Sequence, residues 1–153
     1  MSLINTEPRQ SLRIMLIEDD PDHVLLIRRA IRDLGNETSL DAINDGEQAL
    51  DKLRSEHPHP DLILLDINMP GYSGFDVLAQ LRGDEHLKLI PVVMLTSSEA
   101  QADIVRAYEL GASGYIAKPT HFQELRAILG NTVLYWSAMQ RVSDPNERRS
   151  DSS

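Results

Sequence analysis

Five short apolar runs alternate along the chain with segments whose apolar residues are spaced as on one face of a helix. The runs lie at 12–17, 38–43, 61–65, 90–96 and 114–117. Most of them are typical of buried strands in their apolar residues, whereas the run at 38–43 gives a weaker signal. The segments with helical spacing lie at 21–34, 46–57, 74–83, 99–111 and 121–142. A strand–helix pair repeated five times predicts parallel strands joined by crossover helices, in a doubly wound five-stranded α/β sheet.

Capping and breaking residues mark several of these helix ends. Asp20 followed by Pro21 predicts the start of one helix, and Asp45 and Ser73 predict the starts of two others. Gly35 is well placed to end the first helix. We therefore interpret Asp20 as a capping residue rather than as a ligand.

Polar residues with related chemistry directly follow four of the five predicted strands. The first strand is followed by Glu18 and Asp19 and the third by Asp66, while the fourth ends in Thr96 and the fifth is followed by Lys118. In doubly wound folds the functional crevice lies beyond the carboxyl ends of the strands. These side chains converge if the four strands are neighbours in the sheet.

Carboxylates, a hydroxyl and an ammonium group at one sheet edge suit phosphoryl transfer. Neighbouring carboxylates repel one another, so a site of this kind raises a pKa or recruits a cation. Mg²⁺ fits such a site because it prefers oxygen ligands and keeps several waters. The metal and Lys118 neutralise phosphoryl oxygens, Thr96 hydrogen-bonds another, and one aspartate acts as the nucleophile that forms an acyl phosphate.

Each of these residues taken alone has a simpler interpretation. An Asp after a strand is typical of a turn, and Thr or Ser there commonly caps the next helix, as we expect of Ser97 or Ser98. The coincidence of acids, hydroxyl and lysine at four strand ends favours a functional site. The five histidines do not have the spacing of metal ligands, and we expect structural or solvent-exposed roles for them. They are His23, His57, His59, His86 and His121.

The chain resembles the receiver domain of two-component response regulators. The matching stretches are the ED pair after IMLI, then LILLDINMPGYSG, VVMLTS and GASGYIAKP, in that order over about residues 12–130. The resemblance implies a flavodoxin-like strand order of 2-1-3-4-5 with five helices, the last of them extended. It also implies that Asp66 accepts a phosphoryl group from a sensor histidine kinase. Such a protein is not a conventional enzyme, since it catalyses only its own phosphorylation and dephosphorylation.

The same resemblance implies a set of metal ligands. Asp19 and Asp66 would bind Mg²⁺ directly, and Glu18 would act through a water molecule. The backbone carbonyl of Asn68 would complete the ligands that the protein supplies.

The resemblance also implies how the phosphoryl group is held and sensed. Thr96 and Lys118 would bind the phosphoryl oxygens, and the Lys118–Pro119 peptide bond would be cis. Tyr115 occupies the position of the family's switch aromatic. It would turn inward on phosphorylation, as Thr96 moves towards the phosphate.

The last predicted helix runs on past the point where the receiver pattern ends. Leu125, Ile128 and Leu129 already close the expected core, so the Tyr135–Trp136 pair is either an apolar cap on its own domain or a partner-binding surface, which we favour. An extended helix with no output domain expected after it is similar to the small single-domain regulators paired with bacterial phytochromes. That resemblance implies a homodimer through the last strand and helix, anchored by Tyr135 and Trp136, and a bacterial phytochrome as the kinase.

The composition limits the kinds of binding partner and the cellular location that we expect. A formal net charge of −9 argues against nucleic-acid binding, and the lack of cysteine excludes disulfides and thiolate metal sites. No apolar run approaches the roughly 20 residues of a membrane span, and no secretory signal is present, so we expect a cytoplasmic protein without membrane contact. We expect residues 1–11 to form a flexible arm, 12–142 one receiver domain, and 143–153 a disordered polar tail.

Two other functions compete with a phosphorylated receiver. A haloacid-dehalogenase-type phosphatase also uses an aspartyl nucleophile, a hydroxyl, a lysine and Mg²⁺. It carries the nucleophile on its first strand in an Asp-x-Asp pattern, whereas the first strand here is followed by EDD. A receiver that has lost phosphorylation would act only as an adaptor, but every residue that phosphorylation needs is present.

Overall fold

Strands and helices alternate along the chain as the apolar pattern predicts. The computed structural model describes residues 12–35 and 37–139. The strands are β1 (Leu12–Ile17), β2 (Thr38–Ile43), β3 (Leu62–Leu65), β4 (Val92–Thr96) and β5 (Gly114–Ala117). The helices are α1 (Pro21–Arg32), α2 (Gly46–Ser55), α3 (Gly74–Gly83), α4 (Gln101–Glu109) and α5 (Phe122–Ala138). The predicted arm at 1–11 and tail at 143–153 lie outside the described residues.

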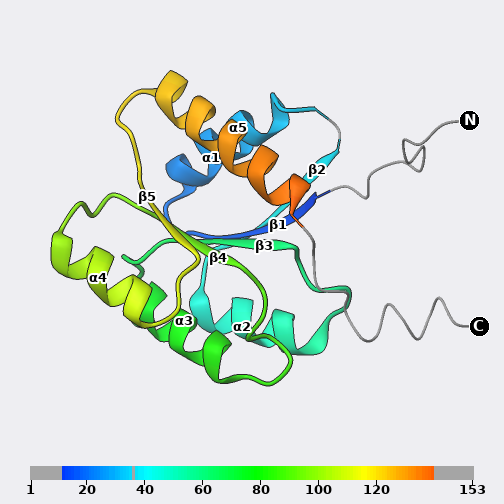
Figure 1. Ribbon diagram of the computed structural model, residues 1–153, viewed down its shortest axis with the longest axis vertical. Coiled ribbons are helices and arrows are strands. Elements are labelled where there is room, and N and C mark those ends of the chain that lie inside the picture. The colour runs from blue at the N-terminus through cyan, green and yellow to red at the C-terminus, as the bar shows by residue number, and fades with distance from the viewer. Residues whose placement is uncertain (1–11, 36, 140–153) are drawn as a thin grey trace, which may run out of the picture.

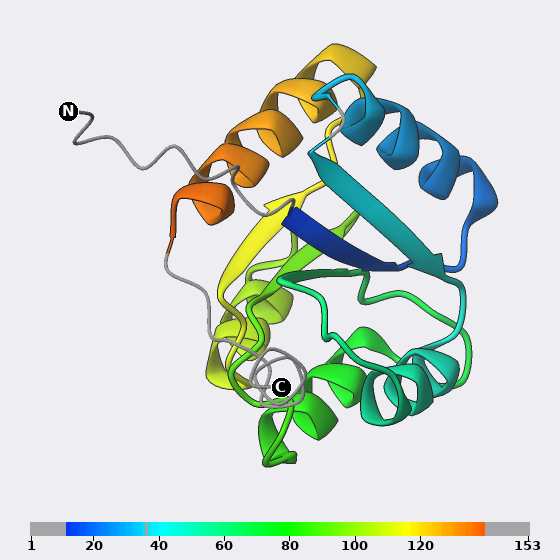
Figure 2. The ribbon, with the colours of Figure 1, turned by 90° about the vertical axis from the view of Figure 1, so that its right-hand side faces the viewer.

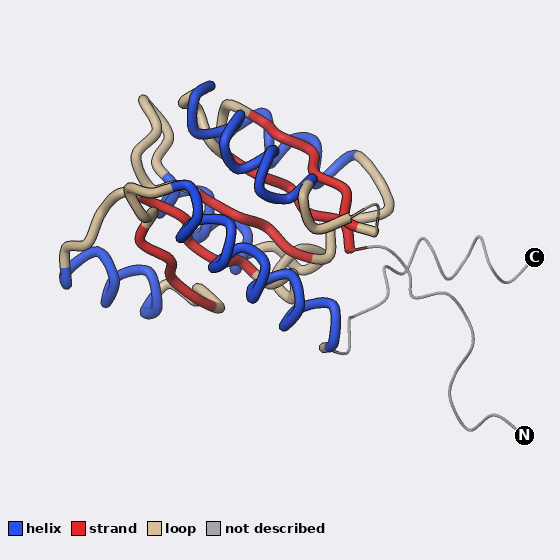
Figure 3. Tube along the Cα trace, turned by 90° about the horizontal axis from the view of Figure 1, so that it is seen from above, coloured by secondary structure: helices blue, strands red, loops and turns tan. Residues whose placement is uncertain are grey.

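The five strands form one parallel sheet in the order β2-β1-β3-β4-β5, which confirms the predicted doubly wound, flavodoxin-like fold. Helices cover both faces of this sheet (Figure 1). α1 and α5 lie side by side on one face, and α2, α3 and α4 lie on the other, as the perpendicular view also shows (Figure 2). In the view from above the helical layers and the sheet lie one behind the other, so the helices overlap the strands (Figure 3).

The central strand β3 is buried on both faces, which explains why its sequence is apolar throughout. Leu62 and Leu64 pack into the core beneath α1 and α5, while Ile63 and Leu65 pack into the core on the other face. Successive side chains of a strand point to opposite faces, so a strand that serves two cores needs an apolar residue at every position.

Backbone hydrogen bonds continue past the strand ends into the first residues of the following loops. The amide of Glu18 donates to the carbonyl of Ile43, and the amide of Asp66 donates to that of Ile17, both at 3.0 Å. The amide of Lys118 donates to the carbonyl of Thr96 at 2.7 Å. The sheet itself therefore fixes the backbone of the polar residues at its carboxyl edge.

The predicted caps start three helices. The Asp20 carboxylate accepts a hydrogen bond from the amide of Asp22, and Asp45 accepts one from the amide of Gln48. Ser73 forms a reciprocal capping box with Asp76 at the start of α3. Asp20 is thus a capping residue, as its position before Pro21 predicts.

Three local predictions are wrong. α4 begins at Gln101 after an uncapped Ala100, because the Ser98 hydroxyl accepts from the amide of Ala100 in the preceding turn and donates to Asp103. α5 ends at Ala138, because the backbone of Met139 is extended, and residues 140–142 lie outside the described residues. The cis proline bond within the described residues is His57–Pro58, and Lys118–Pro119 has the trans form that X–Pro bonds prefer.

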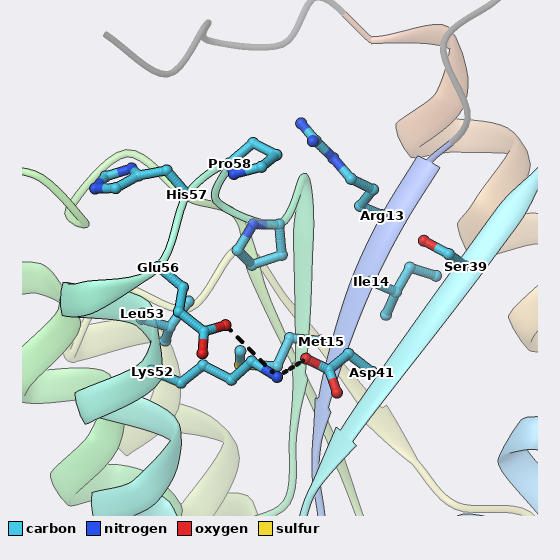
Figure 4. A pocket seen from close by; sticks show the side chains of 11 residues that line it. Arg13, Ile14, Met15, Ser39, Asp41, Lys52, Leu53, Glu56, His57 and Pro58 are labelled. Atoms are coloured by element: carbon cyan, nitrogen blue, oxygen red, sulfur yellow. Dashed lines mark ion pairs between the residues drawn. The ribbon is translucent and has the colours of Figure 1, made fainter. Parts of the chain in front are cut away.

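A cavity lies near the amino ends of the strands, at the opposite edge of the sheet from Glu18, Asp66 and Lys118. Its volume is about 300 Å³, and its walls include the ammonium group of Lys52 between the carboxylates of Asp41 and Glu56 (Figure 4). The Nζ atom of Lys52 lies 2.7 Å from Asp41 and 3.7 Å from Glu56. These ion pairs tie the end of α2 to the edge strand β2.

Candidate functional site: an acidic cluster with a lysine

Three carboxylates meet at the carboxyl edge of the sheet. Glu18 and Asp19 follow β1, Asp66 follows β3, and one ligand atom from each lies within 4.8 Å of the other two. Glu18 and Asp66 are buried, whereas Asp19 is half-buried. The predicted convergence of these residues is therefore confirmed, and it results from the adjacency of β1 and β3.

The Lys118 side chain reaches this cluster from the loop after β5. Its ammonium group forms an ion pair with Glu18, and its Nζ atom lies 3.6 Å from Oδ2 of Asp66. The other Glu18 oxygen, Oε2, accepts a hydrogen bond from the amide of Asp20 at 3.3 Å. Glu18 is thus held on both of its oxygens, and Lys118 lies close to two carboxylates at once.

Burial raises the pKa of Glu18 above its usual value, and the neighbouring Asp66 raises this pKa as well. The hydrogen bond from Lys118 acts in the opposite direction by favouring the ionised carboxylate. A divalent cation would relieve the same repulsion between the acids. The set of hard oxygen donors fits Mg²⁺ or Mn²⁺ better than a softer metal.

The loop after β3 is shaped around Asp66. The amide of Asn68 points at Oδ1 of Asp66 at 3.4 Å, and Asn68 itself is exposed. A Cβ atom on Gly74 would lie 2.1 Å from the backbone carbonyl oxygen of Asp66 and 2.8 Å from Cα of Ile67. Only glycine lets α3 begin this close to the end of β3.

The loop after β4 connects the site to the tyrosine of β5. Thr96 is fully buried, and its hydroxyl oxygen accepts from the amide of Ser98 at 3.4 Å. The Tyr115 hydroxyl donates to the carbonyl of Ser98 at 2.9 Å, and burial raises the pKa of Tyr115. Thr96 and Tyr115 are therefore both bonded to Ser98, so a movement of this loop reaches both side chains.

Sequence reasoning missed His23, which lies in the first turn of α1. Its Nδ1 atom is 2.8 Å from Nζ of Lys118 and 3.4 Å from Oε1 of Glu18. The spacing of the histidines along the sequence gave no reason to expect His23 beside Lys118. One signal was available, because the start of a helix that follows directly on an acidic strand end must lie beside the site.

The two aromatic residues near the end of α5 have different surroundings. Tyr135 is 56% exposed, together with Leu134 at 68% and Met139 at 40%. Trp136 is partly buried against the core under α1 and α5, which also includes the buried Val133. The core thus continues beyond Leu129, so Trp136 caps its own domain while Tyr135 faces outward.

The sequence matches the model of the response regulator receiver domain over residues 14–130. The chain belongs to this family. Receivers are signalling proteins rather than conventional enzymes, and this family assignment replaces the phosphatase alternative. The position of Asp66 after the third strand, not the first, agrees with it.

Two relatives match this chain over most of their own length. The probable methanogenesis regulatory protein FilR2 of Methanothrix harundinacea is 36% identical over 136 residues, which cover 86% of this chain and 88% of that protein. The crystal structure of the phosphorylated cyanobacterial phytochrome response regulator RcpA is 33% identical, with a TM-score of 0.81 over 87% of this chain and 99% of that one. This receiver is thus similar in fold and extent to a phytochrome-associated regulator.

A related structure also bears on the acidic cluster. The Mn²⁺-bound form of response regulator Rcp1 is 30% identical, with a TM-score of 0.76 over 88% of this chain and 99% of that one. A divalent metal is therefore bound in a receiver similar to this chain.

Within the described part of the chain, no helix combines the length and the hydrophobicity that crossing a membrane requires.

Proposed function

We propose that this receiver accepts a phosphoryl group onto Asp66, in the presence of Mg²⁺, from the phosphohistidine of a sensor histidine kinase. The observation that carries the proposal is the placement of Lys118 and two further carboxylates around Asp66. Asp66 is buried, yet it lies at the carboxyl edge of the sheet, where a doubly wound fold places its functional crevice.

Each side chain has a role in this transfer. An Asp66 carboxylate oxygen attacks phosphorus, the bond from phosphorus to the donor nitrogen breaks, and an acyl phosphate forms. Lys118 neutralises negative charge on the phosphoryl oxygens, and the hydroxyl of Thr96 donates to one of them. Bound Mg²⁺, held by Glu18, Asp19, Asp66 and the carbonyl of Asn68, would supply positive charge at the same oxygens.

The signal leaves through the surface of the receiver itself. Thr96 and Tyr115 share Ser98 as a bonding partner, which supports a switch in which Thr96 and Tyr115 move together on phosphorylation. The output is protein–protein interaction or onward transfer of the phosphoryl group, without nucleic-acid binding. A net charge of −9 supports this choice.

The similarity to RcpA supports a bacterial phytochrome as the cognate kinase. We also propose a homodimer through β5 and α5, on the exposed side chains of α5. Leu134, Tyr135 and Met139 place an exposed apolar surface near the end of α5, and such surfaces commonly mark interfaces. We assign Tyr135 as the outward anchor of this dimer and Trp136 as the side chain that supports it from the core.

The intact mass of the protein after incubation with acetyl phosphate and Mg²⁺ tests the function. We expect the wild type to gain one phosphoryl group and Asp66→Ala to gain none. Asp51→Ala, on the exposed face of α2, is the matched control and should gain the group as the wild type does. A folded wild type that gains nothing would support the adaptor function instead, and a gain by Asp66→Ala would mean that another residue accepts the group.

A further inference from the structure

The ammonium group of Lys118 is held from two sides in the structure. One partner is Glu18, and the other is the imidazole of His23, whose Nδ1 atom lies 2.8 Å from Nζ. The Lys118 side chain is 10% exposed and the His23 side chain is 36% exposed. Both residues line a cavity of about 460 Å³ between the start of α1 and the loop after β5. His23 thus stands between solvent and the lysine.

The contact with Lys118 defines the role of each imidazole nitrogen. An ammonium group has three N–H donors and no acceptor, so the nitrogen that faces it at hydrogen-bond distance must accept. Nδ1 of His23 is therefore the acceptor, and the ring proton lies on Nε2. That atom lies 3.6 Å from Oδ2 of Asp20, the capping residue of α1, which is beyond hydrogen-bond distance. The carboxylate of Asp20 thus lies near the Nε2 side of the imidazole, and the Nδ1 side faces the lysine.

The ammonium group of Lys118 has three N–H donors, and each points in a different direction. One donates to Glu18 and one to His23, and Asp66 lies beyond these contacts with its Oδ2 at 3.6 Å from Nζ. Because the donors of an ammonium group are tetrahedral, fixing two of them fixes the direction of the third. The third donor remains for Asp66, whose Oδ2 is the next partner of Nζ, or for a phosphoryl group on that residue.

We propose that His23 is a positioning residue that aims the Lys118 ammonium group at the phosphoryl group on Asp66. This inference rests on the proposed function and deepens it. Without the imidazole, Lys118 keeps the ion pair with Glu18 and the longer contact with Asp66, and its long side chain reaches the phosphoryl oxygens in fewer of its conformations. Preorganised charge of this kind stabilises a transition state more than mobile charge does.

Three substitutions of His23 that differ in the position or presence of a hydrogen-bond acceptor test the proposal. The side-chain oxygen of Asn can occupy the place of Nδ1, whereas the oxygen of Gln reaches the place of Nε2, and Leu offers no acceptor. We would measure the phosphorylation rate of His23→Asn, His23→Gln and His23→Leu as a function of acetyl phosphate and of Mg²⁺. His86→Asn, at an exposed position in the loop after α3, is the matched control.

We expect His23→Asn to stay within about twofold of the wild-type maximal rate, and the Gln and Leu variants to lose roughly tenfold, as for one hydrogen bond to a charged group. The Mg²⁺ concentration for half-maximal rate should stay unchanged, because His23 is not a proposed metal ligand. Equal rates in all three variants, or an equal loss in all three, would overturn the proposal. A wild type that is never phosphorylated would instead overturn the proposed function on which it rests. Thermal unfolding of each variant reports separately on the fold.

Discussion

The Nζ atom of Lys118 lies 3.6 Å from Oδ2 of Asp66, and the same ammonium group is paired with the buried Glu18. One lysine therefore lies against two buried carboxylates and offsets only part of their combined negative charge. Removing a partner from a buried charge leaves that charge without compensation, which costs more than the pair itself contributes. The lysine thus links the stability of the site to its chemistry.

Replacing Lys118 by Met keeps the length and apolar volume of the side chain but removes its charge. We expect the phosphorylation rate with acetyl phosphate to fall about 10²-fold, because one charged donor to the transferred group is lost. Lys52→Met, which breaks a half-exposed ion pair at the other edge of the sheet, should leave this rate within about twofold. Rates from a time course of intact mass would decide, and equal losses in the two variants would contradict the assigned role of Lys118.

Replacing Gly74 by Ala should damage both the fold and the site. Its Cβ would meet the Asp66 carbonyl oxygen at 2.1 Å, and that atom belongs to backbone that the sheet fixes. We expect a loss of about 1–3 kcal/mol in the free energy of unfolding and a slower phosphorylation. Gly83→Ala, where nothing lies within 4 Å of the added atom, is the matched control in the same helix. Urea unfolding curves measure both, and a Gly74→Ala protein as stable as Gly83→Ala would count against the close packing.

Because the pKa of Glu18 is raised, we expect two opposite effects of rising pH. The contribution of Glu18 to the stability of the metal-free protein should fall, and the stabilisation by Mg²⁺ should grow. A carboxyl group whose pKa is higher in the folded state than in the unfolded state, where it is close to 4.5, stabilises the fold below that value. This contribution is lost as pH rises through the folded-state pKa. Mg²⁺ prefers the ionised carboxylates, so the stabilisation by Mg²⁺ should grow over the same rise in pH.

Thermal unfolding of the wild type and of Glu18→Gln, with Mg²⁺ and with a chelator, measures this response. The increase in Tm on adding Mg²⁺ should be small at about pH 5 and larger at about pH 8 in the wild type. Glu18→Gln removes the titrating group and should flatten the dependence. If the Mg²⁺ effect on wild-type Tm were the same at both pH values, the raised pKa of Glu18 would not govern metal binding.

Substitutions of the two aromatic residues of α5 should have different effects, one on the free energy of unfolding and the other on dimer formation. Trp136→Ala removes a side chain that packs against the core, and we expect a loss of roughly 1–3 kcal/mol in the free energy of unfolding. Tyr135→Ser changes an exposed side chain, so its unfolding free energy should stay within about 0.5 kcal/mol of wild type. In the proposed dimer, the same Tyr135→Ser change should raise the dimer Kd about tenfold in sedimentation experiments. A dimer that is indifferent to Tyr135→Ser would exclude this surface as the interface.

The strands and most of the site could be predicted because each depends on local sequence. Leu62 to Leu65 are apolar at every position, as a strand buried on both faces requires. Glu18, Asp66 and Lys118 are brought together by the general rule that parallel strands end at one edge of a sheet. Their convergence could be predicted without knowledge of side-chain directions, whereas their roles came from the resemblance to receiver domains.

The remaining features depend on contacts between distant segments. His23 and Lys118 are 95 positions apart, and only the packing of the start of α1 beside the loop after β5 brings their nitrogens together. The predicted partner-binding surface joined Tyr135 and Trp136, although adjacent residues of a helix point in different directions. Only Trp136 continues the helical spacing of the buried Leu125, Leu129 and Val133, and the core shows that it is the covered member of the pair. The end of α5 at Ala138 likewise follows from the extended backbone at Met139, which no breaker residue announces.

The most direct test of the central claim is the position of the acyl phosphate in the chain. Borohydride reduces an aspartyl phosphate to homoserine, so peptides of the protein treated with acetyl phosphate and Mg²⁺ and then reduced reveal the modified residue. We predict homoserine at position 66, and none when Mg²⁺ is removed by a chelator. Homoserine at Asp19 or at any other aspartate, with Asp66 unmodified, would contradict the account.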